Sequence, residues 1–433
     1  MKKIFAIISS FLILFSCNSG KKSTAIKVEL KHENGVYQLY RDGQPYYIKG
    51  AGCEFGNNQS IASYGANSIR TWGTENGRIS GMQVLDTAQK YGLTVWVGLD
   101  VARERHGFDY NNDSAVQKQL ELMKIEVLKY KDHPALLGWG VGNELNLDSK
   151  NPKVWNAVND LSKMIHQVDG NHPTTTMLAG ISKETVNEIK NRCPDIDFLS
   201  IQMYGDIINL KARIDSSGYK GAYIVSEWGA TGHWEVGKTK WDIPIEQTSS
   251  EKASSIKERW EKAIYANKTE CLGSYVFVWE NKQERTPTWY GLILESGEYT
   301  EMTDVMYEAW NGKSPQNTAP KLDSVFLDNK TRFDNIYLKP GKEYVLKVYT
   351  HDNDNDELTL TSDVIPDDPS LYRQGGDRED RAQSVDCKQK IDFKTMTVKF
   401  NAPDKEGGFR IYAYVHDGKN HGATANVCFY VKK

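Results

Sequence analysis

Residues 136–144 read Leu-Leu-Gly-Trp-Gly-Val-Gly-Asn-Glu, and this stretch decides the fold. It is a nearly continuous apolar run that ends in an amide and a carboxylate. Residues 223–227, Tyr-Ile-Val-Ser-Glu, have the same form and also end in a carboxylate. Runs of this kind are typical of parallel strands that are buried on both faces. Because parallel strands end at one edge of a sheet, we expect Glu144 and Glu227 to share that edge.

Short apolar runs alternate with longer amphipathic stretches from residue 27 to residue 312. The expected strands are 46–51, 67–72, 94–100, 136–143, 174–178, 198–204, 222–227 and 274–279. The expected helices are 57–64 (the weakest pattern), 79–91, 115–130, 154–168, 183–192, 207–217, 251–267 and 303–310. Eight alternations in about 280 residues favour an α/β fold, a (β/α)₈ TIM barrel over residues 27–312, rather than an open doubly wound sheet.

The composition changes after residue 312. Residues 313–320 form a polar linker that contains Pro315 and Pro320. Residues 321–433 then contain short alternating runs between Asp, Asn and Gly turns, at 344–350, 358–362, 397–400, 409–415 and 423–431. This spacing predicts a small all-β sandwich of immunoglobulin-like type.

The N-terminus has the pattern of a targeting segment. Two lysines precede an apolar run at 4–15, which is too short to span a bilayer. Residues 1–16 therefore indicate a signal peptide. Residues 14–17, Leu-Phe-Ser-Cys, resemble a bacterial lipobox, although Phe15 is bulkier than usual there. The resemblance implies a lipidated Cys17, a tether at 17–26 and an outer-membrane lipoprotein of a bacterial envelope; an ordinary secreted protein is the alternative.

The composition also bears on other classes of partner and site. The net charge of −3 gives no basic face for a nucleic acid. Five cysteines follow Cys17, which is an odd number, so no complete disulfide framework is indicated, and pairing of Cys387 with Cys428 stays open. No CxxC or Cys/His cluster is present, so we expect no structural zinc site and no cofactor.

Residues 352–356, Asp-Asn-Asp-Asn-Asp, form a motif with two interpretations. Alternating oxygen ligands are typical of a calcium loop. Asx-rich turns between strands have the same composition, and Glu357 stands where an EF-hand loop has glycine. We therefore expect no metal there and leave the calcium alternative open.

The two strand-end carboxylates suggest a reaction. Strands four and seven of a barrel lie across the ring from each other, so Glu144 and Glu227 can face each other over a pocket. Glycoside cleavage uses such a pair, in which one carboxylic acid protonates the leaving oxygen and one carboxylate meets the developing oxocarbenium ion. A separation of about 5–5.5 Å is expected for a retaining mechanism.

The sequence resembles the clan of retaining (β/α)₈ glycosidases with catalytic acids on strands four and seven. Asn143-Glu144 matches the acid/base motif, and residues 226–229, Ser-Glu-Trp-Gly, match the nucleophile motif. The resemblance covers roughly residues 40–312. It is closest to glycoside hydrolase family 2 catalytic modules, as residues 133–139 (His-Pro-Ala-Leu-Leu-Gly-Trp) and 68–72 (Ser-Ile-Arg-Thr-Trp) also fit.

The domain order resembles a narrower family. Family 2 barrels follow sandwich domains, and none precedes the barrel here. A barrel followed by one immunoglobulin-like domain, in a lipoprotein, is similar to glycoside hydrolase family 158, which implies endo-β-1,3-glucanase activity. This narrower resemblance depends mainly on domain order and on the spacing between Glu144 and Glu227.

The resemblance and the needs of the reaction imply a role for each residue. Glu144 is the general acid/base, and desolvation and the charge of Glu227 should raise its pKa. Glu227 is the nucleophile; Arg70 is expected to lower its pKa, and Tyr204 is expected to donate a hydrogen bond to it. Asn143 is expected to donate to the sugar 2-hydroxyl.

Further side chains are expected around the sugar. Trp279, at the predicted end of strand eight, is expected to form the floor on which the reacting sugar stacks. Nine further residues could line sugar subsites, and in each case packing or a solvated loop is the alternative. They are Trp72, Glu104, His106, Trp228, His233, Trp234, Glu280, Trp289 and Tyr290.

The leading hypothesis is internal hydrolysis of β-1,3-glucan with retention of configuration. The alternatives are another β-linked glycan (a different glucan, a mannan or a galactan), transglycosylation, or a non-catalytic glycan-binding lipoprotein. The intact set of Arg70, Asn143, Glu144, Tyr204 and Glu227 argues against the non-catalytic alternative. The expected partners are a polysaccharide or oligosaccharide and, through the lipid, a membrane, and we expect a monomer.

Overall fold

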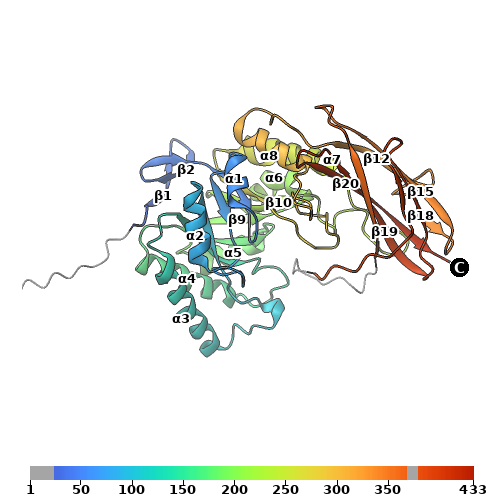
Figure 1. Cartoon of the computed structure of the whole chain (residues 1–433). Coiled ribbons are helices and arrows are strands. Elements are labelled where there is room, and N and C mark those ends of the chain that lie inside the picture. The colour runs from blue at the N-terminus through green and yellow to red at the C-terminus, as the bar shows by residue number, and fades with distance from the viewer. Residues whose placement is uncertain (1–23, 368–378) are drawn as a thin grey trace, which may run out of the picture.

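The computed structural model describes residues 24–367 and 379–433. The predicted signal peptide at 1–16, Cys17 and most of the tether lie outside the described residues. Figure 1 shows a barrel ringed by helices and, beside it, a unit built of strands. Among the described residues, no helix combines the length and the apolar character that a membrane span requires.

The predicted barrel is confirmed, because eight parallel strands form a closed ring in chain order. Residues 273–276 of the last strand pair with residues 48–51 of the first and so close the ring. The strands are β4 (Ile48–Gly52), β5 (Ser68–Arg70), β6 (Thr94–Leu99), β7 (Leu136–Asn143), β8 (Thr174–Ala179), β9 (Phe198–Gln202), β10 (Tyr223–Gly229) and β11 (Cys271–Phe277).

Helices surround this ring, and several of them begin at a side chain that caps the first turn. Ser80 with Gln83, and Thr248 with Glu251, form capping boxes that satisfy the first backbone N–H groups of two helices. The expected helix at 207–217 begins as a 3₁₀ turn, and the one at 251–267 continues past residue 259 as π and 3₁₀ turns. The α-helices are α1 (Asn58–Ser63), α2 (Gly81–Lys90), α3 (Asp113–Tyr130), α4 (Lys153–Val168), α5 (Lys183–Arg192), α6 (Leu210–Ser217), α7 (Ser249–Arg259) and α8 (Glu301–Asn311).

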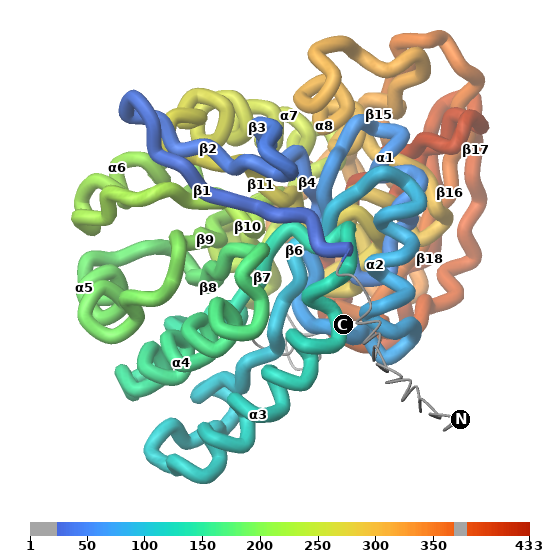
Figure 2. Tube along the Cα trace, turned by 90° about the vertical axis from the view of Figure 1, so that its left-hand side faces the viewer, coloured from blue at the N-terminus to red at the C-terminus, as the bar shows by residue number. Residues whose placement is uncertain are grey.

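A three-stranded antiparallel sheet, which the sequence pattern did not predict, covers the amino-terminal end of the barrel. It consists of β1 (Val28–Glu33), β2 (Val36–Arg41) and β3 (Gln44–Tyr46), and Figure 2 shows it in front of the barrel strands. Val28 and Leu39 are buried in one cluster with Trp96, Leu137 and Tyr275 of the barrel interior. The sheet thus closes this end, and the opposite rim of the ring carries the cleft.

The predicted β-sandwich after the barrel is also confirmed. The described residues of this part form a five-stranded sheet and a four-stranded sheet, ordered β13-β12-β15-β18-β17 and β14-β20-β19-β16. Alternate residues of each sheet meet in one core. The strands are β12 (Lys321–Leu327), β13 (Lys330–Thr331), β14 (Ile336–Leu338), β15 (Glu343–His351), β16 (Thr359–Pro366), β17 (Lys390–Asp392), β18 (Thr397–Asn401), β19 (Gly407–His416) and β20 (Gly422–Val431).

The sequence pattern missed β12, β13, β14 and β17. Three of these four strands have only two or three residues. Cys387 and Cys428 are both buried and free in this domain, so the disulfide that the sequence left open is not formed.

Buried charges join the sandwich to the barrel. The Glu246 carboxylate, which is 2% exposed, binds Lys252 Nζ at 2.5 Å and accepts a hydrogen bond from Asn426 Nδ2 of β20 at 2.7 Å. Arg410 of β19 donates to the carbonyl of Pro244 at 2.9 Å and to Asp367 at 2.8 Å. Buried charges persist only where they are paired, so these contacts fix the sandwich against the barrel.

We predict that Glu246→Gln lowers the free energy of unfolding by about 3–5 kcal/mol, because the Lys252 charge is left buried without its counter-charge. Urea denaturation followed by tryptophan fluorescence measures the change. Asp242→Asn is the matched control, because Asp242 pairs with Lys238 on the surface, and it should change the value by less than about 1 kcal/mol. Equal stabilities of the two variants would contradict the proposed importance of the buried pair.

Candidate active site

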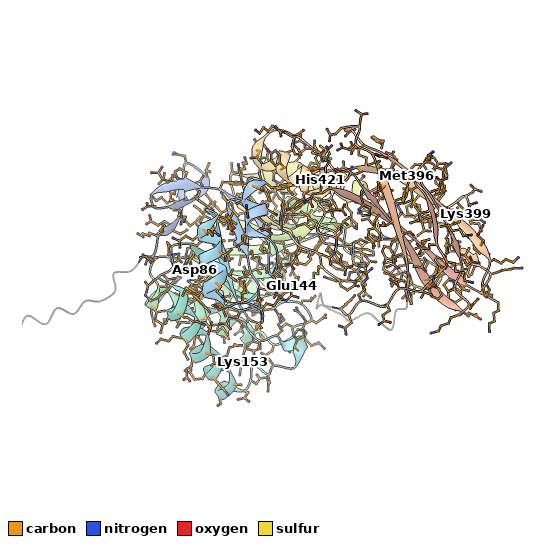
Figure 3. All side chains as sticks on the ribbon, viewed as in Figure 1. Asp86, Glu144, Lys153, Met396, Lys399 and His421 are labelled. Atoms are coloured by element: carbon orange, nitrogen blue, oxygen red, sulfur yellow. The ribbon has the colours of Figure 1, made fainter. Side chains whose placement is uncertain are left out.

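A cleft of about 1010 Å³ lies at the carboxyl-terminal rim of the barrel. Its lining includes Trp72, Asn143, Glu144, Tyr204 and Glu227, all at or just beyond strand ends. In Figure 3, Glu144 lies on the side of the barrel that faces the sandwich. The volume is at the upper end of the range for small-molecule sites, so the cleft has room for more than one sugar ring.

The Glu227 carboxylate is held on both oxygens. Arg70 Nη1 of β5 binds Oε2 at 2.7 Å, and the indole N–H of Trp72 donates to the same oxygen at 3.1 Å. The Tyr204 hydroxyl donates to Oε1 at 2.5 Å. The side chains of Arg70 and Glu227 are only 1% and 11% exposed. The buried guanidinium places a counter-charge beside the carboxylate, and the three donors fix its orientation.

Asn143 is fixed by two donors to one oxygen. Arg70 Nη2 donates to Asn143 Oδ1 at 2.5 Å, and Gln202 Nε2 donates to it at 2.7 Å. Because Oδ1 is occupied, the amide nitrogen is the group that can donate to a ligand in the cleft. Sequence reasoning missed Gln202; the available signal was its position at the end of the sixth strand, two residues before Tyr204.

Glu144 follows the last residue of β7 and has a left-handed backbone, with φ of 51°. Its N–H donates to the carbonyl of Met177 at 2.8 Å, and its own carbonyl accepts from Arg105 Nη1 at 2.6 Å. Burial raises the pKa of the Glu144 carboxyl to about 7, and the charge of Glu227 adds to this rise. The Arg105 guanidinium, 3.7 Å from the carboxylate, opposes it.

These environments separate the two carboxyl groups chemically. Glu227 is paired with a buried cation and held in one orientation, whereas Glu144 keeps a proton up to about neutral pH. One protonated carboxyl group and one carboxylate in the same cleft are what cleavage of a glycosidic bond requires.

The loop after β6 contributes different residues from those expected. Arg103 and Arg105 line the cleft, and Arg103 Nε donates to the carbonyl of Asn143 at 3.1 Å. Glu104 instead accepts hydrogen bonds from Ser149 Oγ and from the N–H groups of residues 150 and 151, so it anchors a neighbouring loop. His106 is exposed and outside the cleft lining. Neither side chain belongs to the cleft lining, so the structure favours the alternative, a loop residue without a sugar contact, for both.

Trp279 is not the floor of the sugar site. Strand β11 ends at Phe277, so Trp279 lies beyond the rim, fully buried among the surrounding helices. Its indole N–H donates to Ser60 Oγ at 2.7 Å, and its ring packs against Tyr64 at 5.1 Å between centroids. Phe277 and Val278 line the cleft instead.

Three other aromatic residues also lie outside the cleft lining. Trp228 is fully buried in the layer between the strands and the helices, because its side chain alternates with that of Glu227 along β10. Trp289 and Tyr290 are each 1% exposed and belong to an aromatic cluster behind Tyr204. The structure therefore gives all three a packing role.

The remaining predicted residues do line the cleft. Trp234 is 59% exposed, and its ring meets that of Tyr204 edge to face at 5.5 Å. The Tyr290 hydroxyl lies 2.9 Å from His233 Nδ1, and burial lowers the pKa of His233 to about 4. Glu280 Oε2 accepts the N–H of Phe55 at 2.6 Å.

The cationic groups of the cleft all have acidic partners. Lys282 binds Glu284 at 2.7 Å, Arg213 binds Asp206, and Arg105 faces Glu144. Arg103 lies 3.4 Å from Asp100. The described lining contains more acids than bases, because Glu54, Glu227, Glu235 and Glu280 are also present.

One group of acids in the described residues has the geometry to hold a metal. Oxygens of Asp352, Asp356 and Asp417 lie within 4.8 Å of one another, in the sandwich. Asp352 Oδ1 also accepts the N–H groups of Asp354 and Asp356, as in an Asx turn, and Lys419 Nζ lies 3.2 Å from Asp356. Both interpretations of the motif thus have structural support, and neither involves the cleft.

Comparison with known proteins supports a glycosidase. Residues 75–277 match the model of the TIM barrel domain of glycosyl hydrolases family 2. No curated protein matches the sequence significantly.

Two solved structures share the fold. A calcium-binding mutant of β-glucuronidase 2 from Bacteroides uniformis matches with a TM-score of 0.51 and 13% identity over 94% of this chain. An FMN-binding β-glucuronidase from Faecalibacterium prausnitzii matches with a TM-score of 0.50 and 16% identity, also over 94%. This chain covers only 48% and 59% of those two chains. The barrel that carries Glu144 and Glu227 is therefore similar to the TIM barrel domain of family 2 glycosyl hydrolases.

Proposed function

We propose that the protein is a retaining glycoside hydrolase that cleaves β-glucan chains internally, as an endo-β-1,3-glucanase. The observation that carries the proposal is the pair of unlike carboxyl groups in one cleft. Glu227 is paired with Arg70 and oriented by Tyr204, whereas burial raises the pKa of Glu144 to about 7.

The mechanism that we propose is a double displacement. Glu227 attacks the anomeric carbon while Glu144 protonates the leaving oxygen, which gives a covalent glycosyl-enzyme. Glu144, now ionised, then takes a proton from water, and the water releases the sugar. Asn143 Nδ2 is placed to donate to the sugar 2-hydroxyl, because both donors to Oδ1 come from the protein.

The charges of the cleft favour a neutral sugar. A uronate needs a cation, but Arg103, Arg213 and Lys282 of the described lining each pair with an acid other than Glu144. Arg105 faces Glu144 itself, beside the scissile bond. The two β-glucuronidases with a similar fold are named for an anionic sugar. The cleft of this protein has more acidic than basic residues in its described lining, which does not favour an anionic ligand. The size of the cleft and the exposed ring of Trp234 suit a chain of neutral sugars, because sugar rings stack on indoles.

We predict that the purified chain lacking residues 1–17 releases a ladder of mid-sized oligosaccharides from soluble β-1,3-glucan at early times. Product size is followed by chromatography, and the anomer formed first is identified by NMR. Internal cleavage gives the ladder because the cleft accepts several sugar units at once. The β-anomer should appear first, since two displacements retain configuration.

The control for this experiment is Glu227→Gln, which should remove nearly all turnover. Release of single sugars alone would contradict internal attack. Hydrolysis of an aryl β-glucuronide but not of an aryl β-glucoside would contradict the neutral substrate and leave the mechanism in place. No activity on a panel of glucans, mannans and galactans would contradict the enzyme proposal itself.

The role of Glu144 predicts a dependence on the leaving group. Glu144→Ala should lose about 10²–10⁴-fold in kcat/KM on a β-glucan oligosaccharide, whose alkoxide must be protonated as it departs. The loss should be much smaller for glycosylation by a dinitrophenyl β-glycoside, whose phenolate needs little protonation. The two substrates are compared by kcat/KM; equal losses on both would exclude Glu144 as the acid.

Arg105 predicts a shift in the pH profile. Activity requires protonated Glu144, so kcat/KM should fall as the pH rises through the pKa of about 7. Arg105→Gln removes a cation that lowers this pKa, so the alkaline limb should move to higher pH. Arg213→Gln is the control, because Arg213 pairs with Asp206 and should leave the limb in place. A limb that is unchanged in Arg105→Gln would contradict the coupling.

A further inference from the structure

Helix α3 exposes three large apolar side chains. Leu122, Ile125 and Leu128 are 50%, 59% and 47% exposed, and each lies three residues from the next on the helix. Residues at this spacing are neighbours on a helix surface. Single exposed apolar residues are common on soluble proteins, but a contiguous group is a feature of contact surfaces. We name these three residues the α3 patch.

Charged side chains of both signs accompany the α3 patch, since Glu121 and Glu126 adjoin Leu122 and Ile125 in the sequence and lysines are interleaved with them. Lys118 and Lys124 are exposed on the same helix, and no ion pair joins either of them to an acid within the described residues. Lys129 is also exposed and pairs with Glu75 at 2.9 Å. Exposed apolar residues with charged residues beside them are found on helices that lie in the interface of a membrane.

The N-terminal chain enters the described structure beside the same helix. Thr24 Oγ1 donates to the carbonyl of Asp132 at 2.7 Å, and Asp132 follows the last residue of α3 by two positions. Cys17 precedes Thr24 by seven residues, which reach at most about 23–25 Å when extended. Ile125 precedes Tyr130, the last residue of α3, by five residues, about 7.5 Å along the helix. A lipid on Cys17 therefore has the α3 patch within its reach.

We propose that the α3 patch lies on the lipid bilayer that anchors the protein through Cys17. The proposal builds on the expected lipidation of Cys17 and is independent of the proposed glycosidase activity. The cleft is at the barrel rim opposite the sheet β1–β3, and its lining includes none of the three residues of the α3 patch.

The test uses an environment-sensitive fluorophore on the mature, lipidated protein. The cysteines of the described residues are all buried and Cys17 carries the lipid, so Ile125→Cys creates one reactive thiol. Phe393→Cys is the matched control, because Phe393 is 53% exposed and lies between β17 and β18, in the part of the sandwich where Figure 3 labels Met396. The labelled proteins are reconstituted into phosphatidylethanolamine vesicles with about a quarter phosphatidylglycerol.

We expect the emission to shift to the blue and to brighten at position 125 and to remain unchanged at position 393. An unchanged spectrum at position 125, in protein that carries the lipid by mass spectrometry and floats with vesicles, overturns the proposal. A shift that occurs without vesicles and grows with protein concentration also overturns it, in favour of a second copy of the chain. A shift seen only in the unprocessed precursor assigns the patch to the apolar run at 4–15 and overturns it too.

A second measurement does not depend on lipidation. The mature-length chain with Cys17→Ser should still partition weakly onto the same vesicles through the α3 patch. Adding Leu122→Ser, Ile125→Ser and Leu128→Ser should weaken this partition at least about tenfold, because three apolar side chains no longer enter the interface. These positions are exposed, so the melting temperature should hold. Equal partition with and without the three substitutions overturns the proposal.

Discussion

The buried ion pair between Arg70 and Glu227 is the interaction on which the rest of the site depends. One guanidinium on β5 binds the carboxylate on β10, the carbonyl of Ser226 and the amide oxygen of Asn143 at the end of β7. These strands are not neighbours, so the contact is made only once the barrel has closed. Glu227 therefore reaches its position in the cleft only in the folded barrel. A charge buried this deeply is tolerated only with its partner in place.

The sequence predicted the barrel and the two strand-end carboxylates because both depend on local patterns. Apolar runs mark buried parallel strands, and a polar residue at the end of a run marks the rim. Arg70, Asn143 and Tyr204 were predicted for the same reason, since each ends or directly follows such a run. The structure brings all three to Glu227 or to its neighbours.

The errors occurred where one residue decides which way a side chain points. Strand β11 ends at Phe277, so Trp279 turns into the helical layer, and alternation along β10 sends Trp228 outward while Glu227 points inward. In the loop after β6, which contains a 3₁₀ turn, Arg103 and Arg105 line the cleft and Glu104 and His106 do not. The sheet β1–β3 was missed because its strands are half exposed and carry many polar residues. Side-chain direction in such segments is set by tertiary packing, which no local pattern contains.

The polar contacts around Glu246 indicate a structural role for the sandwich that its sequence did not suggest. The same carboxylate that binds Asn426 also accepts hydrogen bonds from Thr286 and Thr288, in the loop that brings Lys282 and Glu284 to the cleft. The C-terminal domain thus helps to hold one wall of the cleft in position, because both are hydrogen-bonded to the Glu246 carboxylate. Removing the sandwich at the linker 313–320 would therefore also remove a support of the cleft wall. The linker separates two units of the sequence that are joined in the structure.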